Sequence, residues 1–330
     1  MYVSVDWGRS SIKGKAMGNQ VLFPNVHAKE VRDVDLNFDE YQAEEYLRIQ
    51  FEGEEYMVGD LAVKQGTLPV HSTNDEDLFS PETRMKIMTA IAYLVKDTEE
   101  KVIDLAVNLP ANIYRDKGSI ISTFLNVGES INIDIYDHKK KEYKDANFTI
   151  KRVLVKPQGF FALMDLLLDD SGQPKPELKK KFAQLNIAID IGKCSTDIYV
   201  LDSFKERTFE PVTAIPGMKY AYSAIKRGIK DRFSIGVQEY EVENYVKTME
   251  FKGKPIDDIV GSAYNSLANA IETDIRNELE YFNLADNFFL AGGGATPLKN
   301  YFTSFETTII PNPQFANANG GLKWIRRKFK

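Results

Sequence analysis

The sequence predicts an α/β protein made of two related domains, each a mixed sheet flanked by helices with a smaller outer subdomain, around one ligand cleft. An apolar strand, an Asp-x-Gly turn, small hydroxyl residues and a second strand occur in that order at residues 3–17 and again at 188–200. Strand and helix patterns follow each copy, so each half contains helices that can pack against its own sheet. The repeat therefore indicates an internal duplication whose two turns form halves of one site.

Composition agrees with two globular domains. A chain of 330 residues and 37.5 kDa exceeds the size at which a single core keeps growing. The net charge of -6 excludes a surface that coats nucleic acid by neutralising phosphates. One cysteine excludes an internal disulfide, and three scattered histidines argue against a structural zinc. With no leader pattern and no apolar run long enough to span a membrane, we expect a cytoplasmic protein.

The first half reads as a β-meander, a helix and further strands. Residues 1–5, 13–16 and 21–23 alternate as strands, with a turn at Gly18. Ser80 is placed to cap a helix over 81–95, because Pro81 suits a first helical position. Residues 101–110 read as a buried strand and 131–157 as strands around a charged turn, and a second helix follows Pro157. These strands predict a mixed sheet.

The second half repeats this order. After the second hairpin, helical spacing runs through 262–282, and 287–302 reads as strand, glycine turn and helix. We therefore expect domain I at 1–157, completed by 312–330 and carrying an outer insert at about 31–79. Domain II is expected at 158–311.

The first Asp-x-Gly turn has the residues of a phosphate loop. A glycine between paired strands allows close backbone approach, hydroxyls can donate, and a lysine on the outgoing strand can reach a β- or γ-phosphate. Asp6 lies too close to phosphate unless a cation intervenes, which implies Mg²⁺ held through water. The candidate binding residues here are Gly8, Arg9, Ser10, Ser11 and Lys13. A single Asp-x-Gly turn would be read as a plain hairpin turn without a binding role. Because the turn occurs twice, we favour a phosphate-binding role for both copies.

The second turn repeats the logic, with Asp190 as the carboxylate that binds the metal or its waters. Its candidate binding residues are Gly192, Lys193, Ser195 and Thr196. Lys193 either points into solvent or supplements Lys13 near the phosphates, and we favour solvent because backbone amides do the cradling. Cys194 is expected to be a small packed residue.

Three glycines lie between the last buried strand and a helix. Gly292, Gly293 and Gly294 leave that turn without side chains, which suits the α-phosphate and ribose of a nucleotide. The spacing matches neither the G-x-G-x-x-G fingerprint nor a P-loop. The alternative is a turn that only permits tight packing of strand against helix.

The order of these motifs resembles the superfamily of actin, sugar kinases and heat-shock chaperone ATPases, and implies an actin-like fold around a nucleotide cleft. The likeness covers nearly the whole chain and is greatest to the plasmid-segregating actins of the ParM and Alp type. The stretches that carry it are "VNLPANIYRD", "FTIKRVLVKPQGFFAL", "TAIPGMKYAYSAIKRGI" and "NPQFANANGGLKWI". The second loop departs from the usual Asp-x-Gly-Gly at Lys193 and Cys194.

The resemblance implies a catalytic set of Gln158, Asp6 and Asp190, with Mg²⁺ and ATP, or alternatively GTP, as cofactors. Gln158 falls where the family orients the attacking water, against the alternative of a plain residue at a helix start. A neutral amide positions water but takes up no proton, so we expect a slow ATPase.

No extra motif suggests a second substrate. Sugar kinases carry a further catalytic Asp and chaperones a peptide-binding domain, and we find a recognisable pattern for neither. The expected partner is therefore a second copy, giving head-to-tail filaments that segregate plasmid DNA through a DNA-binding adaptor. The outer insert is expected at that contact, or else is solvated surface. The alternatives are a membrane-attached cytoskeletal scaffold, for which residues 321–330 give a weak amphipathic pattern, and a small-molecule kinase.

Overall fold

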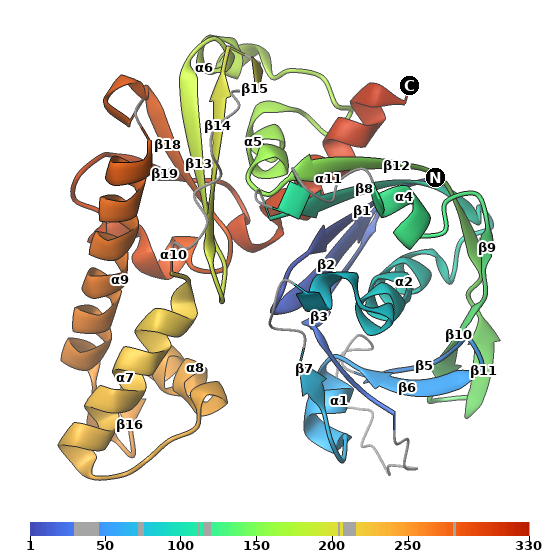
Figure 1. Ribbon diagram of the computed structural model, residues 1–330, viewed down its shortest axis with the longest axis horizontal. Helices are drawn as coiled ribbons and strands as arrows, with labels where there is room; N and C mark the ends of the chain where they lie inside the picture. Colours follow the sequence, from blue (N-terminus) through green and yellow to red (C-terminus); the bar gives the residue numbers. More distant parts are fainter. Residues whose placement is uncertain are drawn as a thin grey trace. The chain divides into compact units, whose positions relative to one another are not determined.

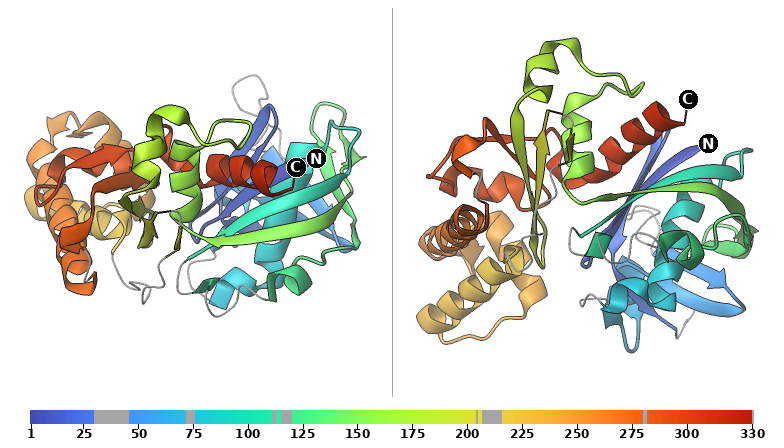
Figure 2. Two further views of the ribbon diagram at one scale, coloured as in Figure 1. Left: turned by 90° about the horizontal axis from the view of Figure 1, so that it is seen from above. Right: turned by 45° about the horizontal axis from the view of Figure 1, so that its top comes forward.

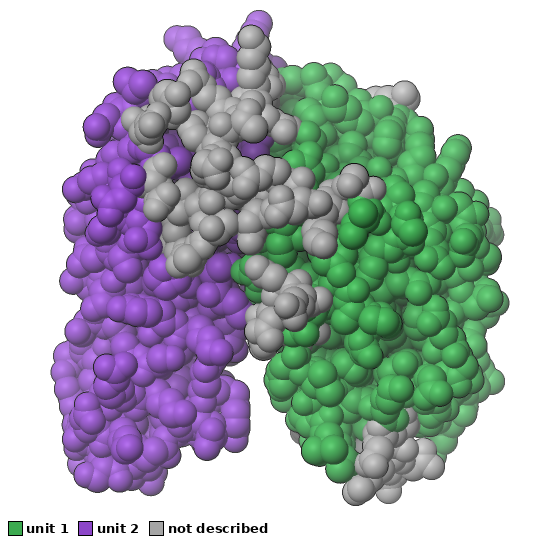
Figure 3. Space-filling model, viewed as in Figure 1, with its two compact units in different colours: residues 1–175, 317–330 green, residues 176–316 purple. Residues whose placement is uncertain are grey.

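A computed structural model describes residues 1–29, 46–71, 76–110, 113–114, 120–203, 205–206, 216–279 and 282–329. Contacts divide the chain into two compact units (Figure 3): unit 1 is Met1–Lys175 with Asn317–Lys330, and unit 2 is Pro176–Ala316. Unit 1 thus extends past the boundary after Pro157 expected from the sequence, because the next helix packs on elements of unit 1. The division into functional domains at that proline stays a prediction.

The described part of unit 1 contains a main sheet and an outer sheet (Figure 1). In order across the main sheet, the strands are β3 (Asn19–Pro24), β2 (Ser11–Ala16), β1 (Tyr2–Trp7), β8 (Val102–Leu109), β12 (Phe148–Pro157) and β9 (Ser130–Ile131). Those of the outer sheet are β11 (Glu142–Asp145), β10 (Ile133–Asp137), β5 (Leu47–Phe51), β6 (Glu54–Val58), β4 (Val26–Ala28) and β7 (Val70–His71). The helices are α1 (Asp60–Gln65), α2 (Pro81–Val95), α4 (Ile121–Phe124), α5 (Phe160–Leu167) and α11 (Ala316–Lys328), with a 3₁₀ turn at Glu76–Phe79.

Unit 2 has one five-stranded sheet, a short hairpin and several helices among its described residues. The sheet runs in the order β15 (Lys205–Glu206), β14 (Thr196–Asp202), β13 (Leu185–Ile191), β18 (Asn287–Ala291) and β19 (Thr307–Ile309), and the hairpin is β16 (Glu250–Phe251) with β17 (Lys254–Pro255). The helices are α6 (Lys179–Phe182), α7 (Met218–Phe233), α8 (Glu239–Thr248), α9 (Asp257–Glu278) and α10 (Ala295–Leu298). Short 3₁₀ turns occupy Pro176–Leu178, Phe282–Leu284, Lys299–Tyr301 and Pro313–Phe315.

The two main sheets share one topology, which confirms the predicted duplication. In unit 1, β1 pairs antiparallel with β2 and parallel with β8, and β8 pairs parallel with β12. In unit 2, β13 pairs antiparallel with β14 and parallel with β18, which pairs parallel with β19. Each Asp-x-Gly turn therefore joins the first hairpin of its sheet at the carboxyl end of a central strand.

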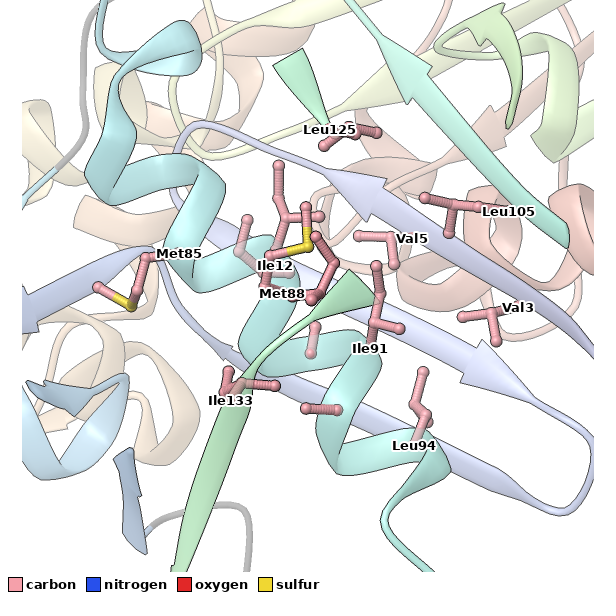
Figure 4. Packing of buried hydrophobic residues seen from close by; sticks show 14 of the residues in the cluster. Val3, Val5, Ile12, Met85, Met88, Ile91, Leu94, Leu105, Leu125 and Ile133 are labelled. Carbon is pink, nitrogen blue, oxygen red and sulfur yellow. The ribbon is translucent and has the colours of Figure 1, made fainter. Parts of the chain in front are cut away.

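Helix α2 covers the main sheet of unit 1, as its sequence predicts. The Ser80 hydroxyl accepts a hydrogen bond from the backbone N–H of Thr83 at 3.1 Å, and Pro81 occupies the first turn. Met88 and Ile91 lie near Val5 of β1 (Figure 4), and Leu94 packs against Gly14 of β2. Each such side chain contributes about 1.5–3 kcal/mol when fully buried. This packing holds the first Asp-x-Gly turn on a well-packed sheet.

The strands expected at 131–157 are present but belong to two sheets. β9 and β12 extend the main sheet, whereas β10 pairs with β5 in the outer sheet and carries β11 with it. The outer sheet is therefore assembled from two distant segments, and residues 31–45 and 72–75 of the expected insert lie outside the described residues. The alternating pattern of β10 reveals one buried face but not which sheet covers it.

Helix α11 packs closely on α5, and both views of Figure 2 show the two helices side by side. The Asn317 side-chain oxygen accepts from the Gly159 N–H at 3.2 Å, and Lys323 pairs with the buried Asp165 at 2.6 Å. Leu322 and Ile325, two apolar side chains of the predicted amphipathic tail, are buried. No helix in the described ranges is long and apolar enough to cross a bilayer.

His27 on β4 predicts a loss of stability in mild acid. Burial, and then the positive charge of Lys86, lowers the pKa of His27 to about 4. Between pH 6.5 and pH 4 the unfolded chain therefore binds a proton that the folded chain does not. The contribution is complete above pH 6.5 and is lost as the pH falls toward 4. Between pH 7.5 and pH 5 the loss should be about 1–2 kcal/mol, since solvent screens part of the effect. Urea unfolding of unit 1 at pH 7.5 and pH 5 measures it.

Substituting His27→Leu should flatten this pH dependence. Some slope will remain, because burial also lowers the pKa of His138. His71→Leu is the control, since that histidine side chain is exposed. An unchanged slope in His27→Leu would show that the source lies elsewhere.

Candidate functional site

The first loop connects β1 to β2 and is fastened by its neighbours. Gly8 has no room for a side chain, because an added Cβ would lie 2.8 Å from the carbonyl oxygen of Ser11. Asn25 holds the loop from the end of β3: its side chain donates to the Gly8 carbonyl and its backbone N–H to that of Ser10, both at 3.0 Å. Residues 8–11 are partly exposed. The loop is thus a fixed turn with an accessible face, as a phosphate loop requires.

Asp6 is buried in β1, directly before this loop, and is held from two sides. Lys13 lies opposite Asp6 in the antiparallel ladder, and its Nζ is 2.6 Å from Asp6 Oδ2. Asn108 lies opposite it in the parallel ladder and donates from Nδ2 to Asp6 Oδ1 at 2.8 Å. The sequence assigned Lys13 to phosphate, and an ammonium has three donors, so the contact with Asp6 does not exclude that role.

Gln158 lies at the same edge of the sheet. β1, β8 and β12 are parallel, so their carboxyl ends meet there, and Gln158 follows β12 directly. Its backbone N–H donates to the Leu109 carbonyl at 2.7 Å and its residue surface is 9% exposed. Gly159 then turns the chain into α5 with a φ of 84°. The structure therefore brings Asp6, Lys13 and Gln158 to the carboxyl edge, where α/β sheets bind ligands.

The second loop connects β13 to β14 and is braced by the start of α7. Backbone N–H groups of Met218 and Lys219 donate to the carbonyls of Gly192 and Lys193 at 3.0 and 2.8 Å. Gly217 must lack a side chain, because an added Cβ would lie 2.7 Å from those same two carbonyl oxygens. The Thr196 hydroxyl donates to the Pro216 carbonyl at 2.8 Å. That hydroxyl is engaged within unit 2 rather than turned toward solvent.

The two residues that depart from the family pattern have definite places. Lys193 Nζ forms an ion pair with Glu243 Oε1 of α8 at 2.6 Å, so the side chain joins the loop to a helix instead of lying alone in solvent. Cys194 is partly exposed and free. The sequence predicted a packed cysteine, and its intermediate exposure in the second turn differs from that expectation.

The glycine turn touches the second loop within unit 2. Gly292 has a φ of 81°, and an added Cβ would lie 2.5 Å from Asp190 Oδ1. The N–H of Gly294 donates to the Ile191 carbonyl at 2.9 Å, whereas Gly293 is exposed, with nothing within 4 Å of an added Cβ. The expected helix is only the four residues of α10 followed by a 3₁₀ turn, so a helix N-terminus contributes little here. The open backbone at Gly293 is what a ligand can approach.

Three asparagines of this region were not predicted as site residues: Asn25, Asn108 and Asn317. Each stabilises a loop or a side chain that lies far from it in the sequence. For Asn108 a signal existed, since a polar residue interrupts an apolar strand one step before its end. Asn25 follows Pro24 at the end of a strand and Asn317 lies between two alanines, and nothing in either local pattern indicates the distant group that the side chain contacts.

The donor atoms fit a hard cation held through water. Asp6 and Asp190 offer carboxylate oxygens, and Asp197 lies directly opposite Asp190 in the ladder, on the same face. Within the described ranges, no group of three or more His, Cys, Asp and Glu side chains could hold a metal ion by itself. Mg²⁺ commonly keeps several waters and takes one or two carboxylates plus substrate phosphates. Each unit by itself offers such a carboxylate, Asp6 in unit 1 and Asp190 in unit 2.

Two family models match the chain. The N-terminal domain of actin-like proteins matches residues 4–160, and the C-terminal domain of archaeal MreB-like actin homologues matches residues 188–304. These two matches contain both Asp-x-Gly loops, Gln158 and the glycine turn. No curated protein matches the sequence.

Solved structures agree with this result and show an actin-like fold. A ParM protein in a 15-stranded filament from Clostridium botulinum is 22% identical over 99% of each chain, with a TM-score of 0.77. Ta0583, an archaeal actin homologue in complex with ADP, is 20% identical over 99% of each chain, with a TM-score of 0.74. The actin-like protein Alp7A is 12% identical over 99% of this chain and 96% of its own, with a TM-score of 0.75. The fold predicted from the order of the motifs is confirmed.

Proposed function

Because this chain belongs to the actin-like proteins, we propose that it is an ATPase that assembles head to tail into nucleotide-dependent filaments, which segregate plasmid DNA through an adaptor. The observation that carries the proposal is the duplicated hairpin: each unit presents an Asp-x-Gly turn at the carboxyl end of a central strand. Ta0583 binds ADP, and ParM and Alp12 form filaments. Those properties come to this chain as part of the proposal.

In this proposal, different residues bind the phosphates, position the attacking water and contact the waters of the metal. Backbone amides at residues 8–11 and 193–195 cradle phosphate oxygens, and Lys13 adds a positive charge. Gln158 orients the attacking water at the carboxyl edge of unit 1. Since an amide does not accept the proton of that water, catalysis depends on positioning and electrostatics, and hydrolysis is slow. Asp6 and Asp190 orient waters of the metal. When bound, Mg²⁺ neutralises charge on the phosphate oxygens.

Filament formation follows from a contact between different surfaces. Such a contact does not close on itself, so it propagates. The outer sheet of unit 1 supplies one candidate surface, because β7 is an edge strand and apolar side chains surround it. Val63, Leu68 and Val70 are exposed there by 46, 81 and 52%. A neighbouring subunit would cover this patch, consistent with the contact expected for the outer insert.

Light scattering with Mg²⁺ and nucleotide tests the proposal. We expect scattering to rise above a critical protein concentration with ATP and to fall as phosphate is released, because hydrolysis weakens the contact. ADP alone and ATP with EDTA are the controls. The absence of polymer with both ATP and GTP at any accessible concentration would refute the filament function.

A pair of surface variants separates assembly from nucleotide binding. Leu68→Glu should raise the critical concentration about tenfold or more, since a contact residue of this size contributes over 1 kcal/mol and a buried charge is costly. ATP affinity should stay unchanged. Met17→Glu is the control, because Met17 is 79% exposed on the β2–β3 turn and away from β7. Equal effects of both substitutions would exclude β7 as a specific contact.

A further inference from the structure

Asn108 is a fully buried amide at the carboxyl end of β8, next to Asp6. Its Nδ2 donates to Asp6 Oδ1 at 2.8 Å, and its Oδ1 accepts from the backbone N–H of Trp7 at 3.2 Å. A backbone N–H can only donate, so it fixes which end of the amide is oxygen. The Nδ2 group must therefore face Asp6, and the contact has a single direction.

The fold itself does not require an asparagine at this position. The duplication supplies an internal comparison: Asp6 pairs with Asn108 across the parallel ladder, and Asp190 pairs with Ala291 at the equivalent place in unit 2. Burying an amide stabilises a sheet no better than burying an alanine unless its hydrogen bonds are satisfied. The second unit builds the same strand order with a methyl group. The amide in unit 1 therefore serves the carboxylate beside it.

The two partners of Asp6 constrain it differently. Lys13 reaches Oδ2 through a long side chain with many rotamers, whereas Asn108 is short and locked by Trp7. The terminal torsion of an aspartate is broad, so a carboxylate held by lysine alone would turn with it. Asn108 fixes the plane of the carboxylate. Each oxygen can then accept a second hydrogen bond in a set direction.

We infer that Asn108 is a positioning residue that orients Asp6 to accept a hydrogen bond from a water of the nucleotide-bound Mg²⁺. This inference rests on the proposed function. Through Asn108, β8 would influence how strongly nucleotide affinity depends on Mg²⁺, although Asn108 itself would contact neither metal nor nucleotide. Its loss should weaken binding of the Mg²⁺ complex more than binding of the free nucleotide.

Binding of a fluorescent ATP analogue, with Mg²⁺ and with EDTA, tests the inference. Asn108→Leu keeps the branched shape and removes both hydrogen bonds. We expect it to weaken binding in Mg²⁺ about tenfold, the factor for one hydrogen bond to a charged group, and to change binding in EDTA less than about twofold. Asn108→Asp keeps the acceptor for Trp7 but replaces the donor with a like charge, so its loss in Mg²⁺ should be at least as large.

Asn186→Leu is the matched control. Asn186 is also fully buried, and it donates to the carbonyls of Lys181 and Gln184 at 2.7 and 2.9 Å, at the amino end of β13. Its loss should lower the melting temperature and leave the ratio of the two affinities unchanged.

The outcomes separate the inference from its premise. A wild-type protein that binds neither ATP nor GTP refutes the proposed function and the inference with it. A second outcome would refute the inference but not the proposed function. In it, the wild-type protein binds nucleotide in an Mg²⁺-dependent way, and Asn108→Leu lowers the affinity by the same factor in Mg²⁺ and in EDTA. If Asn108→Leu does not fold, the same comparison is made with Asn108→Asp, whose side chain has the shape of the native one. The ratio of its affinity losses in Mg²⁺ and in EDTA then tests the inference.

Discussion

Replacing Gly320 with alanine should prevent stable folding of unit 1, or lower its melting temperature by about 10 °C or more. Gly320 is where α11 crosses α5 backbone to backbone. An added Cβ would overlap the carbonyl oxygen of Phe161 and lie 2.7 Å from the backbone nitrogen of Asp165. Neither neighbour is a flexible side chain, so relief requires one helix to move.

Several contacts resist that movement. Asn317 binds the start of α5, and Lys323 binds both the Asp165 carboxylate and its backbone carbonyl. On the other side, Gly321 lies against Ser4 of β1, and the Tyr2 hydroxyl donates to the Phe329 carbonyl at 2.9 Å. If α11 moved outward, all of these contacts would be broken at the same time. We therefore expect a loss of about 3–5 kcal/mol, more than the usual cost of overpacking, because backbone atoms of both helices must move.

Thermal and urea unfolding measure this loss, and Gly261→Ala provides the control. Gly261 lies inside α9, where an added Cβ would meet only the Tyr301 hydroxyl at an ordinary 3.7 Å. That substitution should be neutral or stabilise by about 0.5–1 kcal/mol, because alanine favours a helix interior over glycine. Comparable stability in Gly320→Ala and wild type would show that α11 does not sit on α5 at this distance.

Replacing Gly292 with alanine should weaken nucleotide binding by about a hundredfold or more. The backbone at Gly292 has a φ of 81°, which an alanine adopts only with strain. Its Cβ would also lie 2.5 Å from Asp190 Oδ1, so the carboxylate or the turn must shift. A displacement of about 1 Å in a positioned group can cost that much. Titration with a fluorescent ATP analogue measures the affinity.

Gly293→Ala tests whether the glycine turn contacts the nucleotide, because this substitution should leave the fold of the turn unchanged. Nothing lies within 4 Å of an added Cβ at Gly293 and its φ is not in the left-handed region, so the melting temperature of unit 2 should stay unchanged. If nucleotide approaches the turn at this open backbone, affinity should fall about tenfold from the added methyl group. Wild-type affinity in both variants would remove the glycine turn from the site.

The sequence predicted elements whose signals are local. Ser80 with Pro81 marks the start of α2, and the two Asp-x-Gly turns mark the hairpins of both sheets; each depends on residues a few positions apart. The fold class followed from the repetition, and the order of motifs led to the actin-like family.

Other features depend on contacts between residues far apart in the chain, which carry no local signal. The pairing of Asn108 with Asp6 exists only once β1 and β8 are aligned, and the partition of β10 and β12 between two sheets depends on what covers them. The length of α10 was misjudged because a helical pattern over 295–302 does not distinguish a single turn from a continuing helix. Lys193 was placed in solvent because its partner Glu243 lies on a helix whose position the sequence does not give.

The place of α11 in the chain has a consequence for biosynthesis. This helix follows all of unit 2 in the sequence but packs into unit 1, so unit 1 is encoded in two separate pieces. During translation the first 175 residues leave the ribosome before their closing helix has been made, while unit 2 is a continuous segment. A nascent chain thus exposes the surface of α5 around Phe161 until the codons of α11 have been read, and a stop codon before them leaves that surface uncovered.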